Sequence, residues 1–253
     1  MKLFIEKKWK YFLLLIPIII IIVIVAYTND YYRAMPEAQI MLHSNDKVEY
    51  KGSPWIEYTA KNKIITKGLI IYPGGKVAPQ AYAPLAVKLA ESGFKVVIVP
   101  MPLKLAVLSP NKAEKVIEKY PQIKQWYIAG HSLGGVMAAQ FAYKNQDQIN
   151  GLILLASYPQ KSSNLSSSDI KVLSMYGTKD GFVGKHKIDD SKKLLPKSTK
   201  WIAIKGGNHS QNGWYGFQKG DNTATITRDE QQNIIAKFIR SEEHTSELQS
   251  PRL

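Results

Sequence analysis

The sequence of 253 residues contains no cysteine. Disulfide bonds, thiolate metal sites and cysteine nucleophiles are therefore excluded, and so is lipid attachment to an N-terminal cysteine. Acidic residues are scarce, because 20 Asp and Glu stand against 34 Lys and Arg. Long apolar runs are also missing, except for one run close to the N-terminus. With 45% apolar residues, the chain can nevertheless bury a substantial core.

The basic excess lies in the central part of the chain. Residues 31–239 hold 28 Lys and Arg against 15 Asp and Glu, a net charge of +13. These lysines are scattered singly, without a basic run and without interleaved aromatic residues, so we expect no nucleic-acid partner. The interpretation that we favour is a solvated surface drawn to anionic envelope polymers or lipid headgroups.

The one long apolar run follows four lysines near the N-terminus. No charged residue occurs from Tyr11 to Asn29, and these 19 residues would form a helix about 29 Å long. This length roughly matches the hydrocarbon core of a bilayer. We therefore expect residues 1–30 to be a cytoplasmic lysine cluster and an uncleaved transmembrane helix, which makes the chain a single-pass protein of the cell membrane with an extracytoplasmic domain. A cleaved signal peptide and a buried soluble helix are the alternatives.

The C-terminal segment resembles the translation of a sequencing adapter. The resemblance is carried by "RSEEHTSELQS", from Arg240 to Ser250. We therefore expect residues 240–253 to be an artefactual tail that is disordered and carries no function. A natural polar tail is the alternative.

Between these ends, apolar runs of strand length alternate with amphipathic stretches of helix length. The uniformly apolar runs are typical of strands buried on both faces, as in a parallel sheet between two layers of helices. We predict an α/β domain over residues 48–239, preceded by a juxtamembrane linker over residues 31–47. The main strands are predicted over residues 68–75, 95–100, 125–130, 151–157, 170–177 and 199–207.

The string "GHSLGG" occupies the junction between a predicted strand and a predicted helix. In a parallel sheet the reactive crevice lies at the carboxyl ends of the strands, and a Gly-x-Ser-x-Gly turn holds its serine at that edge on a strained bend. Gly130 and Gly134 leave room for the neighbouring strand and helix, so Ser132 would project its hydroxyl into the crevice. The N–H of Leu133 could face a developing oxyanion. A chance match in a loop is the alternative.

A serine nucleophile needs a base and a group that orients the base. Among five histidines, His209 follows the last predicted strand in a glycine-rich loop, at the same sheet edge as Ser132. We expect His131 to face elsewhere and His186 to lie on a solvated helix face. Asp180 follows the preceding strand and therefore reaches the same edge. The pattern predicts nucleophile, acid and base in the order expected of an α/β-hydrolase. A structural loop histidine and a simple turn aspartate are the alternatives.

Residues from about 66 to 239 resemble the α/β-hydrolase superfamily, in particular the small branch similar to dienelactone hydrolases but with a serine nucleophile. The motifs that carry the resemblance are "GHSLGG", "YGTKDG" and "GGNH". It implies an α/β-hydrolase fold, cleavage of an ester or related acyl bond through an acyl-enzyme, and no metal or cofactor. It also implies a second oxyanion donor in "YPGGK", at Gly75 with Lys76 as its neighbour. Pro73 stands where many relatives have a histidine.

The sequence constrains the substrate less. Only 12 residues separate the predicted strands over 151–157 and 170–177, so we expect an open site with little or no cap domain. We predict that Trp214 and Tyr215 form one wall of the substrate pocket and that Lys76 favours an anionic substrate. Core packing of the aromatic rings and an ordinary surface lysine are the alternatives. The expected substrate is a small-molecule or lipid-like acyl compound, whereas an acyltransferase and a non-catalytic envelope-binding module remain open.

Overall fold

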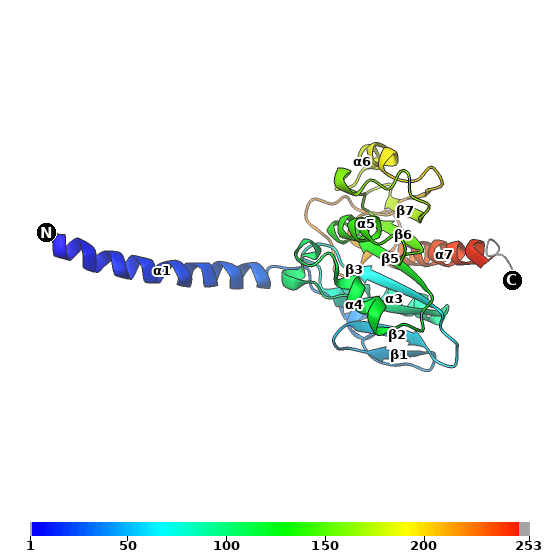
Figure 1. Cartoon of the computed structure of the whole chain (residues 1–253), viewed down its shortest axis with the longest axis horizontal. Coiled ribbons are helices and arrows are strands. Elements are labelled where there is room, and N and C mark those ends of the chain that lie inside the picture. The colour runs from blue at the N-terminus through cyan, green and yellow to red at the C-terminus, as the bar shows by residue number, and fades with distance from the viewer. Residues whose placement is uncertain (1, 248–253) are drawn as a thin grey trace. The chain divides into compact units, whose positions relative to one another are not determined.

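The computed structural model describes the backbone of residues 2–247, and the side chains of residue 9 and of residues 15–241. The chain forms two compact units, with the boundary between Tyr31 and Tyr32. The first unit holds one helix, α1 (Lys2–Asn29), and the second holds a sheet with helices on both of its faces (Figure 1).

The second unit begins earlier than the pattern of apolar runs indicates. The N–H of Tyr32 donates to the carbonyl of Lys76 at 2.8 Å, and a short helix, α2 (Pro36–Gln39), follows. Residues 32–47 are thus part of the folded unit, whereas the sequence analysis treats them as a linker before Val48. They pair through their backbone and bury few side chains, so they leave little periodicity in the sequence.

One mixed sheet of eight strands has the order β1-β2-β4-β3-β5-β6-β7-β8. Strand β2 is antiparallel to both of its neighbours, β1 and β4. All other neighbouring strands of the sheet are parallel. The predicted mostly parallel α/β sheet is therefore confirmed. The strands are Val48–Lys51 (β1), Ile56–Ala60 (β2), Lys67–Tyr72 (β3), Phe94–Ile98 (β4), Gln125–His131 (β5), Gly151–Leu155 (β6), Lys171–Gly177 (β7) and Lys200–Ile204 (β8).

The parallel strands are apolar at every position because alternate side chains enter two separate cores. In β3, Leu69 and Ile71 pack with residues of α3 and α7 on one face. Ile70 and Tyr72 pack with residues of α4 and α5 on the other face. Since successive side chains of a strand point to opposite faces, both faces need an apolar covering layer.

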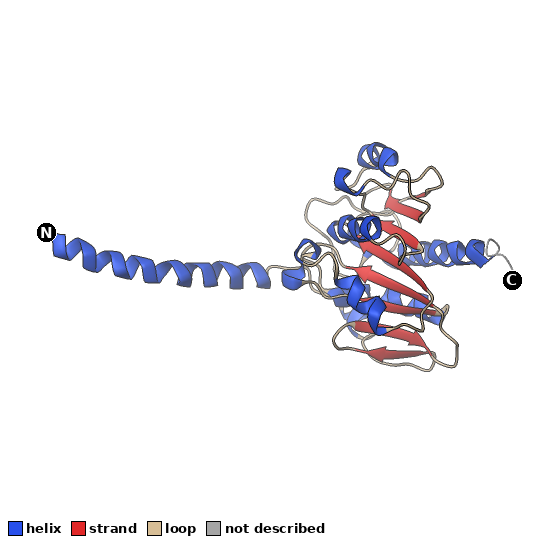
Figure 2. Ribbon diagram, in the orientation of Figure 1, coloured by secondary structure: helices blue, strands red, loops and turns tan. Residues whose placement is uncertain are grey.

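Helices supply that covering layer on both faces of the sheet (Figure 2). Between β6 and β7, the described chain forms only the short turn η4 and no cap domain. The remaining helices are α3 (Ala83–Glu91), α4 (Lys112–Lys119), α5 (Leu133–Lys144), α6 (Lys185–Ser191) and α7 (Arg228–Glu247), with 3₁₀ turns η1 (Pro79–Tyr82), η2 (Pro102–Lys104), η3 (Ala106–Leu108), η4 (Lys161–Ser163), η5 (Lys192–Leu194) and η6 (Ser210–Asn212).

The strand order reverses its direction between β3 and β5. These two strands are neighbours in the sheet, and Tyr72 at the end of β3 is paired with Gly130 near the end of β5. The chain leaves β3 toward β4 on one side and leaves β5 toward β6 on the other. In open α/β sheets, ligands bind in the crevice outside such a reversal, at the carboxyl ends of the strands. We call this border of the sheet the carboxyl edge.

Helix α1 includes the predicted membrane span over residues 11–29. Within the part of the chain that the structure describes, no helix is both long and apolar enough to cross a membrane. The side chains of residues 11–14 lie outside the described residues, and the exposed apolar run that remains, Leu15 to Val25, is shorter than the ~20 residues that a bilayer requires. The transmembrane prediction is therefore not confirmed.

The C-terminal segment differs from its prediction. Helix α7 continues without a break to Glu247, although we expected disorder from residue 240 onward. The segment is rich in Ser and Glu and extends a helix that already exists, and elongation of a formed helix is much easier than nucleation. Residues 248–253 of the predicted tail lie outside the described residues.

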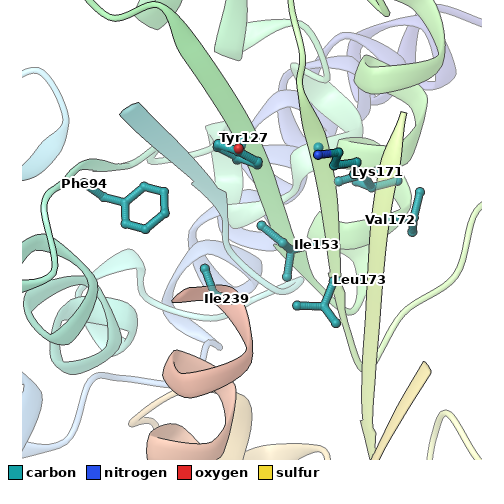
Figure 3. Close-up of a pocket in the computed structure, with 9 residues that line it drawn as sticks. Phe94, Tyr127, Ile153, Lys171, Val172, Leu173 and Ile239 are labelled. Carbon is teal, nitrogen blue, oxygen red and sulfur yellow. The ribbon is translucent and has the colours of Figure 1, made fainter. Parts of the chain in front are cut away.

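A small apolar cavity lies between the sheet and α7 (Figure 3). Its volume is about 20 Å³, and Tyr127, Ile153, Leu173 and Ile239 are among its lining residues. The strand residues come from the first half of β5, β6 and β7, which places the cavity away from the carboxyl edge. It has room for about one water molecule and little polar lining, so it is a packing gap.

We expect Phe141→Ala to lower the free energy of unfolding by about 3–5 kcal/mol, because truncating a buried phenylalanine leaves a cavity. Phe141 lies in α5 and is fully buried against the sheet. Tyr143→Ala is the matched control, since this aromatic residue of the same helix is 41% exposed. Urea denaturation of both variants provides the comparison, and equal losses would contradict this packing.

Candidate active site

Ser132 lies on a strained turn at the end of β5. Its backbone has φ 52° and ψ −123°, a conformation that L-residues rarely adopt. A Cβ on Gly130 would lie 2.4 Å from the carbonyl oxygen of Gly134, and a Cβ on Gly134 would lie 2.2 Å from that of Tyr72. The turn therefore requires glycine at both positions, as the motif predicts. Helix α5 begins at Leu133, directly after the serine.

Hydrogen bonds hold the backbone of this turn on both sides. The N–H of Ser132 donates to the carbonyl of Leu155 at 3.1 Å. The carbonyl of Ser132 accepts from the N–H of Gly135 at 2.9 Å and from the hydroxyl of Ser157 at 2.7 Å. Because the backbone is fixed by strand β6 and by the first turn of α5, the strained φ can persist.

Asp180 and His209 lie side by side, as the sequence predicts. The ring nitrogen Nδ1 of His209 is 3.0 Å from Oδ2 of Asp180, and the two side chains are 1% and 0% exposed. The other carboxylate oxygen of Asp180 accepts from the N–H groups of Phe182 at 2.8 Å and Val183 at 2.7 Å. With an anionic Asp180, Nδ1 carries the hydrogen and Nε2 is left to accept a proton.

His131 connects the serine turn to the loop of His209. Its ring centroid is 4.6 Å from that of His209, so the residue before Ser132 packs against the candidate base. Its Nδ1 is 2.8 Å from the hydroxyl of Tyr82, which itself accepts a hydrogen bond from the N–H of Gly74 at 2.8 Å. Tyr82 therefore joins His131 to the turn after β3. Burial lowers the pKa of His131 well below its usual value, the neighbouring His209 adds to this lowering, and the ring of His131 is therefore neutral.

The turn after β3 lies against the start of α5. A Cβ added to Gly75 would be 3.2 Å from Cδ2 of Leu133, which brings the two predicted oxyanion donors into the same neighbourhood. The N–H of Gly74 is bound to Tyr82, and the N–H of Lys76 donates to the carbonyl of Lys104 at 2.9 Å. Of the three residues in this turn, Gly75 is therefore the better candidate for an oxyanion donor.

Asp221 is a buried carboxylate that the sequence analysis missed. Its Oδ1 accepts from the N–H of Gly181 at 2.9 Å and from that of His209 at 3.4 Å. Its Oδ2 accepts from both the N–H and the hydroxyl of Ser210, at 2.8 and 2.6 Å. Asp221 thereby ties the loop of Asp180 to the loop of His209. It stands in a polar loop without periodicity, so only its position in space reveals it.

The aromatic residues after His209 differ from each other in their surroundings. Tyr215 is buried in the core, and its ring centroid lies 6.1 Å from that of His131. It therefore packs behind His131 and does not form an exposed wall of a substrate pocket. Trp214 is partly exposed, and Arg228 lies over its ring at 5.8 Å. Phe182, which was not among the predicted site residues, contacts His209 edge-on, with 5.0 Å between the ring centroids.

The remaining predictions concern His186, Lys76 and metal ions. His186 is 89% exposed and pairs with Asp190 at 3.2 Å, so it lies on a solvated helix face. Lys76 is at the carboxyl edge, with its backbone at φ 57°. Among the residues that the structure describes, no group of three or more His, Asp or Glu side chains is arranged to hold a metal ion.

A sequence model described as "Alpha/beta hydrolase family" matches residues 68–233. That range contains the serine turn, the loop of Asp180 and the loop of His209. None of the curated proteins matches the sequence.

Solved structures of similar fold include several enzymes at low identity. Est1E from Butyrivibrio proteoclasticus, solved with ferulic acid bound, has a TM-score of 0.57 at 14% identity, over 79% of this chain and 97% of its own. The esterase Est2 from Thermogutta terrifontis has a TM-score of 0.54 at 13% identity, over 80% and 93%. MGS-MChE2, an alpha/beta hydrolase from a lagoon-sediment metagenome, has a TM-score of 0.55 at 14% identity, over 78% of this chain and 100% of its own. These likenesses show the fold.

We expect Asp221→Asn to lower the free energy of unfolding by about 2–3 kcal/mol, because a buried amide donor would replace an acceptor that faces several N–H groups. Asp229→Asn is the matched control. Its side chain is 57% exposed and forms a surface ion pair with Lys88, a kind of pair that contributes ~1 kcal/mol or less. Urea denaturation measures both losses. If the two variants lose the same stability, Asp221 does not hold the two loops together.

Proposed function

Because the chain belongs to the alpha/beta hydrolase family, we propose that it is a serine hydrolase that cleaves an ester or a related acyl bond. The observation that carries the proposal is the buried contact of 3.0 Å between His209 and Asp180, at the same sheet edge as the strained turn of Ser132. The esterase Est2, which has a similar fold, favours the same reaction class.

In the proposed mechanism His209 is the general base. Its Nε2 takes the hydroxyl proton of Ser132 as the oxygen attacks the acyl carbonyl, and the proton then passes to the leaving alcohol. Asp180 holds the imidazole in the tautomer with Nδ1 protonated and stabilises the cation that forms. Water next attacks the acyl-enzyme with His209 again as base, which releases the acid and restores the serine.

The developing oxyanion is held by backbone N–H groups. Leu133 is the first residue of α5, so its N–H has no acceptor within the helix. The second donor is the N–H of Gly75, whose turn lies against Leu133. Donors that are fixed before the reaction stabilise the charge without reorganisation, and each contributes about 3–4 kcal/mol to the transition state in comparable enzymes.

The proposed substrate is a small-molecule or lipid-like acyl ester. The short connection between β6 and β7 favours an open site. Est1E was solved with ferulic acid, an aromatic acid, and esters of aromatic acids are accordingly suitable probes for this chain. Within the family we place the chain in the small branch similar to dienelactone hydrolases, on the strength of its motifs and its lack of a cap. Partly exposed Trp214 is the better candidate for a pocket wall than Tyr215.

We expect Ser132→Ala to abolish hydrolysis of p-nitrophenyl acetate, with a loss of at least about a thousandfold, because the reaction then lacks its nucleophile. A fluorophosphonate probe should label the full chain at Ser132, and peptide mapping should find no label in the variant. The Ser162→Ala variant is the control, because Ser162 is an exposed serine of η4 and its replacement should leave the rate unchanged.

The same experiment separates the alternative functions. A labelled enzyme that releases more product when an alcohol or amine acceptor is added would be an acyltransferase that uses the same residues. A folded chain that neither reacts with the probe nor hydrolyses the ester would be a non-catalytic binding module, and the proposed function would be lost.

We further propose that residues 1–30 tether this domain to the cell membrane, with the N-terminus in the cytoplasm and the domain outside. The support is the uncharged sequence over residues 11–29, the lysines that precede it and the exposed apolar side chains from Leu15 to Val25.

We expect the full chain to stay in the membrane pellet after an alkaline carbonate wash. The double variant Ile20→Lys/Val23→Lys should move to the soluble fraction, because each lysine at the centre of a span costs about 3 kcal/mol. Recovery of the unaltered chain in the supernatant would contradict the tether. A mass that lacks the first ~26 residues would identify a cleaved signal peptide.

A further inference from the structure

The loop after β4 exposes three large apolar side chains. Leu103 is 45% exposed, and Val107 and Leu108 are each 51% exposed. We call these three residues the apolar lip. In most soluble domains such side chains are exposed singly, and a group of them on one short segment marks an interaction surface.

The backbone of this loop is held in a strained shape. Leu103 has φ 49° and Lys104 has φ 57°, two successive left-handed conformations in residues that rarely adopt them. Hydrogen bonds from the N–H groups of Lys104 and Leu108 to the carbonyls of Met101 and Leu105 close the turns around them. Strain of this kind clusters at functional segments, so it favours a role for the exposed side chains.

The apolar lip borders the proposed catalytic site. The carbonyl of Lys104 accepts a hydrogen bond of 2.9 Å from Lys76, the residue after the proposed oxyanion donor Gly75. Cδ2 of Leu105 lies 3.9 Å from where a Cβ of Gly75 would be. The turn η3, which contains Val107 and Leu108, packs against α5. The loop that carries the lip therefore contacts the turn of Gly75 and the helix that begins after Ser132.

The chain enters this domain at the same edge. The N–H of Tyr32 donates to the carbonyl of Lys76 at 2.8 Å, and the N–H of Met35 donates to the carbonyl of Trp214 at 2.8 Å. The ring of Tyr32 lies 5.6 Å from that of Tyr215. The first residues of the domain thus run between the turn after β3 and the loop after His209. The apolar segment over residues 15–25 precedes this entry point in the chain.

The charges around the lip suit an anionic lipid surface. Arg33, Lys76 and Lys104 lie in backbone segments that are hydrogen-bonded to one another at this edge or directly follow such a bond. Basic residues around an apolar patch bind anionic headgroups while the apolar side chains reach the acyl boundary. The net charge of +13 over residues 31–239 adds a long-range attraction of the same sign.

We propose that the apolar lip docks the carboxyl edge on an anionic lipid surface, so that the enzyme takes acyl esters held in that surface. This inference rests on the proposed function and names its substrate class as a lipid-borne acyl ester. The open site without a cap then has its apolar cover supplied by the bilayer.

The test uses the full chain in vesicles of phosphatidylcholine and phosphatidylglycerol. Two esters with the same leaving group are compared: p-nitrophenyl palmitate in the bilayer and p-nitrophenyl acetate in the water. For Val107→Ser/Leu108→Ser we expect the rate on the palmitate to fall at least about tenfold, because two apolar contacts with the bilayer are lost, and the rate on the acetate to stay within about twofold.

Ile64→Ser is the matched control. Ile64 is 95% exposed and lies in the loop before β3, at the opposite edge of the sheet, so its replacement should change neither rate. Thermal unfolding of each variant checks that the domain is intact, and both lip residues are exposed enough for serine to be tolerated.

Each outcome decides between separate ideas. If the double variant and Ile64→Ser hydrolyse the palmitate as fast as the unaltered chain, the lipid-docking proposal is wrong while the esterase stands. A parallel fall on both esters would assign the lip to the substrate pocket and overturn docking. Loss of self-association in the double variant, with the palmitate rate unchanged, would assign the lip to a second copy. Hydrolysis of neither ester by the unaltered chain would defeat the proposed function itself.

Discussion

The close approach between the start of α5 and the end of β3 is the constraint on which the carboxyl edge depends. Gly134 lies so near the carbonyl of Tyr72 that no side chain fits between them. At this contact the helix begins directly after β5, and Ser132 between them has a positive φ. The turn that follows Tyr72 is thereby held against Leu133. A single steric contact at the reversal point of the sheet thus places the serine and the proposed oxyanion turn together.

Buried polar groups then fix the rest of the edge. Asp180 accepts hydrogen bonds from two backbone N–H groups besides its contact with His209. Asp221 accepts hydrogen bonds from the loop of Asp180 and from the loop of His209. Buried carboxylates are tolerated only when hydrogen bonds satisfy them, and here those bonds also set the distance between the two loops. The neutral His131 packs against the ring of His209 without bringing a positive charge to it. The geometry of the base is therefore held by the whole edge and not by Asp180 alone.

The sequence predicts the features that depend on local chemistry. The alternation of apolar runs identified the parallel sheet, and glycine spacing located the turn of Ser132, because both follow from backbone geometry at short range. Asp221 and Tyr82 could not be predicted, since each depends on contacts between segments far apart in the chain, and the core position of Tyr215 was one of two alternatives. Residues 32–47 were missed because backbone pairing has no side-chain pattern. The helix through residues 240–247 extends α7, and composition alone does not show that an adjoining helix will continue.

The proposed site combines a buried base, His209, with a short connection between β6 and β7. His209 and Asp180 are almost fully covered, so water does not compete for the hydrogen bond between them. The short connection from β6 to β7 leaves nothing to enclose a substrate from that side. Selectivity must then come from segments that border the carboxyl edge: the loop after β4, the turn after β3 and the residues around Tyr32. Two of these are hydrogen-bonded to Lys76, so they form one continuous border next to the turn of Ser132. Under the proposed function, a substrate would approach Ser132 past this border, where the loop after β4 exposes Leu103, Val107 and Leu108.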